Sequence, residues 1–264
     1  MTRKICLFLI ICMSILLFVA CSANDETSKK NQDSDSVPST NETDKDQNND
    51  DYSDHDDNAS TSDDKTNQNK KNEITKQIKL EKTSVKQPTD FPTDQKVKSV
   101  IKQNEKNRYT IDYETDTNDK IATFIGTKYA SANAANKELS QFMDGKDVPA
   151  NEQTDKDLGH GVKGYGEGAA GHAYFSWGEG NWLLSISSLT KDQMDNPAIA
   201  KKMVNYLESH TLPAPKDTGI VYVDYPEGGD TVSVDIRWQE GDMLYQLKTN
   251  NVPLDALQIA TSVQ

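Results

Sequence analysis

Two ten-residue segments of the chain align with each other without a gap, and this internal similarity restricts the fold more than any other feature. Residues 175–184 and 236–245 each alternate between apolar and polar positions up to Glu-Gly-Asn or Glu-Gly-Asp, and alternate again beyond it. Glycine beside asparagine or aspartate between two such runs is typical of a β-hairpin, because the tight turn needs backbone angles that these residues tolerate. Both segments are therefore predicted to be hairpins of one repeating unit.

A helical pattern follows each hairpin. Asn196 and Pro197 supply a cap and a first-turn proline, and apolar residues then recur at helical spacing until about His210. Pro253 begins a shorter helix after the second hairpin. A fainter copy upstream has predicted strands at 108–114 and 121–129 and a predicted helix at 132–143. The three predicted repeats are residues 108–143, 160–210 and 219–263.

These units favour an α+β fold. A curved antiparallel sheet, built from repeated β-hairpin–helix units, is predicted to carry its helices on one face. A short helix is predicted at 97–101, before the first repeat. The glycine-rich residues 164–171 break the alternating pattern, and they are predicted to form a mobile loop or a strongly bent strand.

The first twenty residues have the features of an export signal. Arg3 and Lys4 precede an almost wholly apolar run, which is shorter than the roughly 20 residues that a membrane-spanning helix needs. The run ends at residues 17–21, Leu-Phe-Val-Ala-Cys, which resemble the lipobox of bacterial lipoproteins. The resemblance implies that a signal peptide, 1–20, is removed and that a lipid on Cys21 anchors the chain to a membrane. A retained membrane anchor and an ordinary secretory signal are the alternatives.

The cysteines agree with this interpretation. Cys6 and Cys12 lie in the segment that would be removed, and none follows Cys21. The exported chain would therefore have no disulfide and no thiolate ligand for a metal.

The tract after Cys21 is polar. Residues 22–72 have too few apolar side chains to offset the cost of ordering their backbone, so disorder is predicted. Residues 73–87 are basic, and we interpret them as more linker, with a surface-binding neck as the alternative. Prolines at 88 and 92 mark the start of the folded part, because the residue before a proline is pushed out of helical geometry. The predicted organisation is signal peptide 1–20, lipidated acidic tether 21–90 and one domain 91–264.

Motifs for catalysis, metals and nucleic acids are not specific here. Gly-x-Ser-x-Gly does not occur, and the two Ser-x-x-Lys matches, at Ser99 and Ser188, lack the companion motifs of penicillin-binding enzymes. The histidines of the predicted domain do not have the spacing of a helical zinc site: His160, His172 and His210. The net charge of −13 opposes nucleic-acid binding. We therefore predict no enzyme activity, no metal, no cofactor and no nucleic-acid partner.

Five aromatic residues have two interpretations: Tyr174, Trp177, Trp182, Trp238 and Tyr245. They could line a ligand groove, or they could form the core between sheet and helices. Their alternating positions on the predicted strands favour the core.

The two Trp-x-Glu-Gly sequences, at 177–180 and 238–241, carry a wider resemblance. Together with the lipobox and the polar tether, they resemble uncharacterised surface lipoproteins of Bacillus-type Gram-positive bacteria, over residues 95–264 of the predicted domain. The resemblance implies a place on the extracytoplasmic face of the cell membrane and no activity. Our leading hypothesis is a non-enzymatic binding module for an envelope protein, peptide, glycan or lipid. A lipid-carrying envelope chaperone or sensor and a cell-envelope hydrolase are the alternatives.

Overall fold

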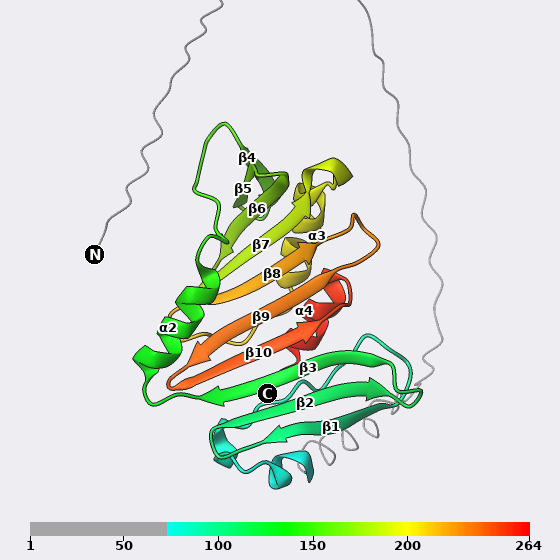
Figure 1. Ribbon diagram of the computed structural model, residues 1–264. Helices are drawn as coiled ribbons and strands as arrows, with labels where there is room; N and C mark the ends of the chain where they lie inside the picture. Colours follow the sequence, from blue (N-terminus) through cyan, green and yellow to red (C-terminus); the bar gives the residue numbers. More distant parts are fainter. Residues whose placement is uncertain (1–72) are drawn as a thin grey trace, which may run out of the picture. The chain divides into compact units, whose positions relative to one another are not determined.

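The computed structural model describes residues 73–264, and within them ten strands form one hydrogen-bonded sheet (Figure 1). Its spatial order is β1-β2-β3-β10-β9-β8-β7-β6-β5-β4. The strands are β1 Val97–Asn104, β2 Arg108–Thr115, β3 Lys120–Lys128, β4 Asp155–Gly159, β5 Val162–Ala169, β6 His172–Glu179, β7 Trp182–Leu189, β8 Gly219–Tyr225, β9 Ser233–Glu240 and β10 Met243–Thr249. Every neighbouring pair is antiparallel except β7 and β8, which run parallel.

Three longer helices cover the sheet: α2 Ala132–Met143, α3 Asn196–Leu207 and α4 Pro253–Thr261. Residues 73–77 are also helical. Ser131 caps α2 by accepting a hydrogen bond from the backbone N–H of Ala134, and Asp195 caps α3 by accepting one from Ala198. The predicted cap Asn196 is wrong, because it is the first residue of α3 and its buried side chain donates to Ser188. All three helices begin where the sequence predicts them to within a residue.

The helices lie on both faces of the sheet, with α2 in front and α3 and α4 behind it in Figure 1. Helix α3 and helix α4 cover the main core, and Leu139 of α2 packs against Ile220 and Leu244 on the opposite face. The prediction that the helices lie on one face of the sheet is therefore wrong. Strands β8 and β10 carry apolar residues on both of their faces, so each face needs a cover.

The predicted antiparallel sheet of hairpin–helix units is also wrong. The sheet is mixed, strands make up 40% of the described residues and helices 23%, and the strands run in series of three or four between helices. Helix α3 returns the chain to the end of the sheet where β7 began, so β8 can only run parallel to β7. The two aligned segments do form hairpins, β6–β7 and β9–β10, as predicted.

Two local predictions are wrong. Residues 97–101 belong to strand β1, which pairs with β2 and has a bulge near Lys102, so their apolar spacing is not helical. Of the glycine-rich residues, 164–169 belong to strand β5, which pairs in unbroken register with β6, and 170–171 form the turn between them. The predicted mobile loop is therefore wrong, whereas the alternative of a strand agrees with the structure. A Cβ atom on Gly164 would lie 2.4 Å from the ring of Phe175, so glycine here lets that ring lie flat against the sheet.

The predicted tether boundary at residue 90 is wrong for residues 73–90. Ile78, Leu80 and Val85 are buried in the main core. We call residues 78–91 the strap. It crosses the same face as α3 and α4, and its backbone accepts hydrogen bonds from Tyr109 Oη (2.8 Å) and Tyr245 Oη (3.0 Å). The few apolar side chains of the strap are interspersed with lysines, so the polar composition of the segment does not indicate that it is buried.

Residues 1–72, which include Cys21 and the predicted signal peptide, lie outside the described residues. Among residues 73–264, no helix is long and apolar enough to cross a membrane.

Candidate functional site

Four of the five aromatic residues lie in the core. Trp177, Trp182 and Trp238 are 2%, 7% and 0% exposed, and Tyr245 is buried beside them. Tyr174 is half-buried and stacks on His172. Side chains two positions apart on a strand share a face, and neighbours point to opposite faces, so Tyr174 is separated from Trp177 by the sheet itself. The groove interpretation is therefore wrong for Trp177, Trp238 and Tyr245, whereas Trp182 also borders a cavity at the edge of the core.

An aromatic row crosses the sheet at the end where the two aligned hairpins turn, which we call the hairpin end. Trp182, Trp238 and Tyr245 follow one another with ring centroids 6.1 Å and 5.3 Å apart. Gly219 lies between the first two in the register, and a Cβ atom on it would lie 2.7 Å from the Trp182 ring. The row is covered at its ends, because Trp182 Nε1 donates to the Pro213 carbonyl (3.2 Å) and Tyr245 Oη to the strap.

The second hairpin holds a complete indole–carboxylate–ammonium contact at this end. Trp238 Nε1 donates a 2.8 Å hydrogen bond to Glu240 Oε1, because residues two apart on strand β9 face the same side. Lys86 Nζ of the strap lies 2.8 Å from the same oxygen, and 5.7 Å from the centre of the Tyr245 ring. The carboxylate is therefore paired by one neutral donor and one cation.

The first hairpin has the same indole and carboxylate but no ammonium. Trp177 and Glu179 stand at the positions of Trp238 and Glu240 in the alignment. Trp177 Nε1 and Glu179 Oε2 are both buried, and neither has a hydrogen-bond partner among residues 73–264. No lysine or arginine of this part of the chain forms a salt bridge with Glu179.

Burial raises the pKa of the Glu179 carboxyl above its ordinary value. Hydrogen bonding with the Trp177 indole lowers this pKa, although the contact is too long or too bent to count as a hydrogen bond by its geometry. The negative charge of Glu208 raises the pKa, and His160 lowers it. His160 itself lies against α3, with Nδ1 3.5 Å from Glu208 Oε2 and Nε2 3.1 Å from Asn205 Oδ1. The histidine therefore contacts the neighbouring carboxylate and not Glu179.

Glu179 opens onto a cavity of about 470 Å³ at the hairpin end. Its walls come from the β6–β7 turn, from the C-terminal end of α3 and from residues 210–215. Trp182, Leu207 and Leu212 supply apolar surface, and Glu179 is the acidic side chain in the lining. We call this the Glu179 pocket. An apolar cavity with one charged group is a common form of ligand site.

The motifs examined for catalysis and metals do not come together. Ser188 Oγ accepts a hydrogen bond from buried Asn196 (3.0 Å), which gives it a structural partner. The three histidines lie in separate places, since His210 stacks on Tyr206 and the other two contact Glu208 and Tyr174. In the part of the chain that the structure describes, no group of three or more histidine, cysteine or acidic side chains could hold a metal ion.

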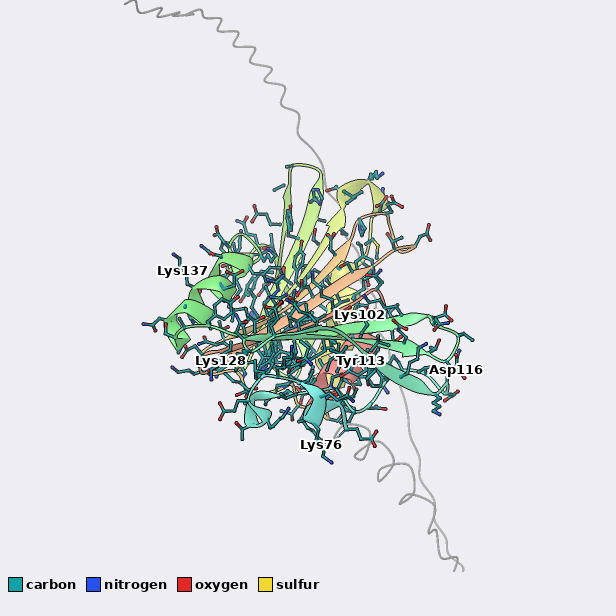
Figure 2. The ribbon with its side chains drawn as sticks, turned by 60° about the horizontal axis from the view of Figure 1, so that its bottom comes forward. Lys76, Lys102, Tyr113, Asp116, Lys128 and Lys137 are labelled. Atoms are coloured by element: carbon teal, nitrogen blue, oxygen red, sulfur yellow. The ribbon has the colours of Figure 1, made fainter. Side chains whose placement is uncertain are left out.

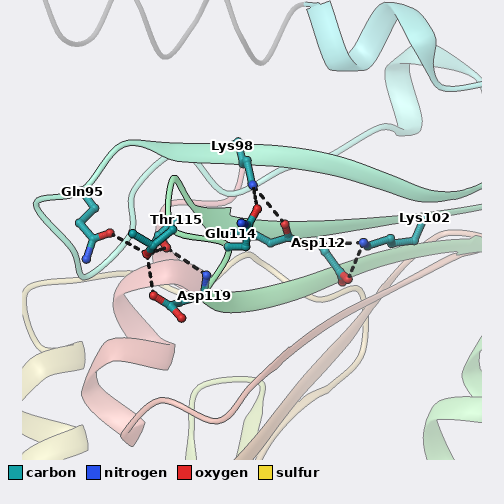
Figure 3. Close-up of polar contacts among 9 residues, drawn as sticks. Gln95, Lys98, Lys102, Asp112, Glu114, Thr115 and Asp119 are labelled. Carbon is teal, nitrogen blue, oxygen red and sulfur yellow. Dashed lines mark hydrogen bonds and ion pairs between the residues drawn. The ribbon is translucent and has the colours of Figure 1, made fainter.

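A second cluster of charges lies along strands β1 and β2 (Figure 3). Lys98 and Lys102 of β1 pair with Glu114, and Lys102 also approaches Asp112 (3.8 Å). Lys120 Nζ lies 3.1 Å from Asp112. Asp112 and Glu114 are largely buried, and each already has a lysine cation. We therefore interpret this cluster as a set of structural ion pairs between neighbouring strands.

Lysines are spread over the surface. Those labelled in Figure 2, Lys76, Lys102, Lys128 and Lys137, project from different elements and lie apart from one another. They do not form a single basic patch.

Comparison with protein-family models, curated proteins and solved structures gives no match to this chain. The candidate site therefore rests on geometry. The sequence prediction missed Glu179, which served there only to mark a turn. The signal was present in the repeated Trp-x-Glu, because strand residues two positions apart place an indole N–H beside a carboxylate.

Proposed function

We propose that this protein is a lipid-anchored binding module of the cell envelope, and that the Glu179 pocket is its binding site. The anchoring part of the proposal is supported by the lipobox-like residues 17–21 and by the position of Cys21 as the last cysteine of the chain. The folded part would then lie on the extracytoplasmic side of the membrane.

The binding part is supported by one observation. Glu179 is a half-buried carboxylate without a cation, although the matching Glu240 has one. A buried charge without a partner is unfavourable in the free protein, so a chain that keeps it gains stability when a ligand supplies the missing charge. The apolar walls of the pocket supply further contact area.

Anchoring is tested by growing cells with radiolabelled palmitate. The wild-type chain should take up label and sediment with membranes, and the Cys21→Ser variant should do neither. Label in the variant, or none in the wild type, would contradict the lipid anchor.

Binding is tested by native mass spectrometry of the full chain released from membranes. A molecule that stays bound to the wild type and is lost on substituting Trp182 would support the Glu179 pocket as the binding site, and an acyl lipid in this role would favour the lipid-carrying alternative. A molecule retained equally by the wild type and the Trp182 variant would contradict the pocket as the site.

A further inference from the structure

We infer that the Glu179 pocket receives the ammonium group of a lysine side chain, presented by an extended peptide segment of a partner protein. This inference names the ligand class for the pocket, and it rests on the function proposed above. It is carried by a comparison within the molecule, between the two Trp-x-Glu hairpins.

In the second hairpin, a lysine of the chain itself already occupies the corresponding site. Lys86 reaches Glu240 from an extended part of the strap, whose backbone is held at the same residue: Tyr109 Oη accepts from the Lys86 N–H (3.0 Å) and donates to the Lys86 carbonyl (2.8 Å). The strap is thus a peptide that delivers one ammonium group to an indole-bonded carboxylate. The chain itself provides the occupant of this site.

The first hairpin shows the same site without the ligand. Both the Trp177 indole N–H and one oxygen of Glu179 are buried without hydrogen-bond partners, and Trp177 is 2% exposed. An ammonium group at Glu179 would give this half-buried carboxylate a cation and a charge-assisted contact like that of Glu240. Glu208, whose side chain is 43% exposed nearby, adds a second negative charge that favours a cation.

The walls of the pocket suit the rest of a lysine side chain. Trp182, Leu207 and Leu212 present apolar surface beside the carboxylate. A lysine buries its aliphatic stem along such a surface while its ammonium group reaches the charge at the end. In the sister site the Lys86 ammonium likewise lies near an aromatic ring, that of Tyr245.

The experiment uses the indole N–H signals of the ¹⁵N-labelled full chain in detergent micelles. The chain has three tryptophans, so each site has its own reporter: Trp177 and Trp182 for the Glu179 pocket, and Trp238 for the occupied one. The probe is the capped peptide Ser-Val-Lys-Gln-Pro, which copies strap residues 84–88. Its control carries norleucine in place of lysine and so keeps the stem without the charge.

The lysine peptide should shift the Trp177 and Trp182 signals to saturation and leave Trp238 unchanged. The affinity of the lysine peptide should be about tenfold or more lower for Glu179→Gln than for the wild type. The norleucine peptide should bind the wild type with an affinity about tenfold or more below that of the lysine peptide. Glu167→Gln is the matched control, because it makes the same change on an exposed position of strand β5. The unchanged Trp238 signal shows in each sample that the fold is intact.

Two outcomes overturn the inference, and they differ in what they say about the proposed function. If both peptides shift Trp182 equally well, the pocket binds ligands but does not select ammonium, so only the inference fails. If neither peptide shifts Trp177 or Trp182 at millimolar concentrations, the pocket has no peptide ligand and the proposed binding site fails with it.

Discussion

Trp238 and Glu240 are joined by a 2.8 Å hydrogen bond from the indole Nε1 to the carboxylate Oε1, and this bond exists because the two residues stand two positions apart on one strand. The strap adds the ammonium of Lys86 to the same oxygen. The molecule thus contains one complete Trp-x-Glu site and one incomplete copy of it at Trp177 and Glu179.

Removing the charge should have opposite effects in the two sites. Glu240→Gln leaves the Lys86 ammonium without its carboxylate and should lower the free energy of unfolding by about 1–2 kcal/mol. Glu179→Gln removes an unpaired, half-buried charge, so it should leave the stability unchanged or raise it at neutral pH. Urea denaturation of both variants and the wild type measures this. Equal losses would show that the two carboxylates are paired alike.

The stability of the protein should depend on the protonation of Glu179. Burial raises the pKa of this carboxyl above its ordinary value of 4.5, so the folded chain holds the proton more tightly than the unfolded chain. The stability that this group contributes is therefore fully present below pH 4.5 and is lost as the pH rises through the folded-state pKa. Glu208 raises the pKa of this carboxyl and His160 lowers it, both through their charge.

Unfolding free energies of the wild type and Glu179→Gln, measured from about pH 4 to about pH 8, check the sign of this pH dependence. As the pH rises, the free energy of unfolding of Glu179→Gln should increase relative to that of the wild type. Towards acid pH, the difference between the two free energies should shrink. Glu167→Gln should follow the wild-type profile, because its side chain is exposed. A variant that keeps the wild-type slope would exclude Glu179 as the source.

A side chain at Gly219 should destabilise the protein. A Cβ atom would lie 2.7 Å from the Trp182 ring, so Gly219→Ala must displace that ring from the aromatic row, at a cost of about 1–3 kcal/mol. Gly178→Ala is the matched control on strand β6, where nothing lies within 4 Å of the new methyl group. Thermal denaturation compares the two, and similar melting temperatures would mean that the ring is free to move.

The strap should contribute to the core. Leu80 is 1% exposed, so Leu80→Ala should lower the free energy of unfolding by about 2–5 kcal/mol, as other buried leucines do. Lys79→Ala, at the exposed neighbouring position, should change it little. If both variants unfold like the wild type, residues 78–91 behave as the linker that their composition suggested.

Local structure could be predicted here because its causes are local. The turn residues at 180 and 241, and the first-turn prolines of α3 and α4, place their elements within a residue or two. Pairing between distant elements could not be predicted in the same way. The parallel contact of β7 with β8 depends on the path of α3, and the position of α2 depends on which apolar face of β8 remains uncovered.

The candidate site likewise has one part that the sequence predicts and one part that depends on tertiary packing. That Trp177 and Glu179 share a face follows from strand periodicity alone. That Lys86 pairs with Glu240 depends on strap residues 78–91, whose buried Ile78 and Leu80 are masked by lysines in the sequence. The difference between the two hairpins therefore arises from tertiary packing.

The most direct test of the account is the pKa of the Glu179 carboxyl, followed by carbon-detected NMR with and without the strap-derived peptide. An ammonium group beside the carboxylate favours its charged form, so the lysine peptide should lower this pKa, and the norleucine peptide should leave it where burial holds it. A Glu179 pKa that is the same with both peptides would contradict the claim that this pocket binds the ammonium group of a lysine.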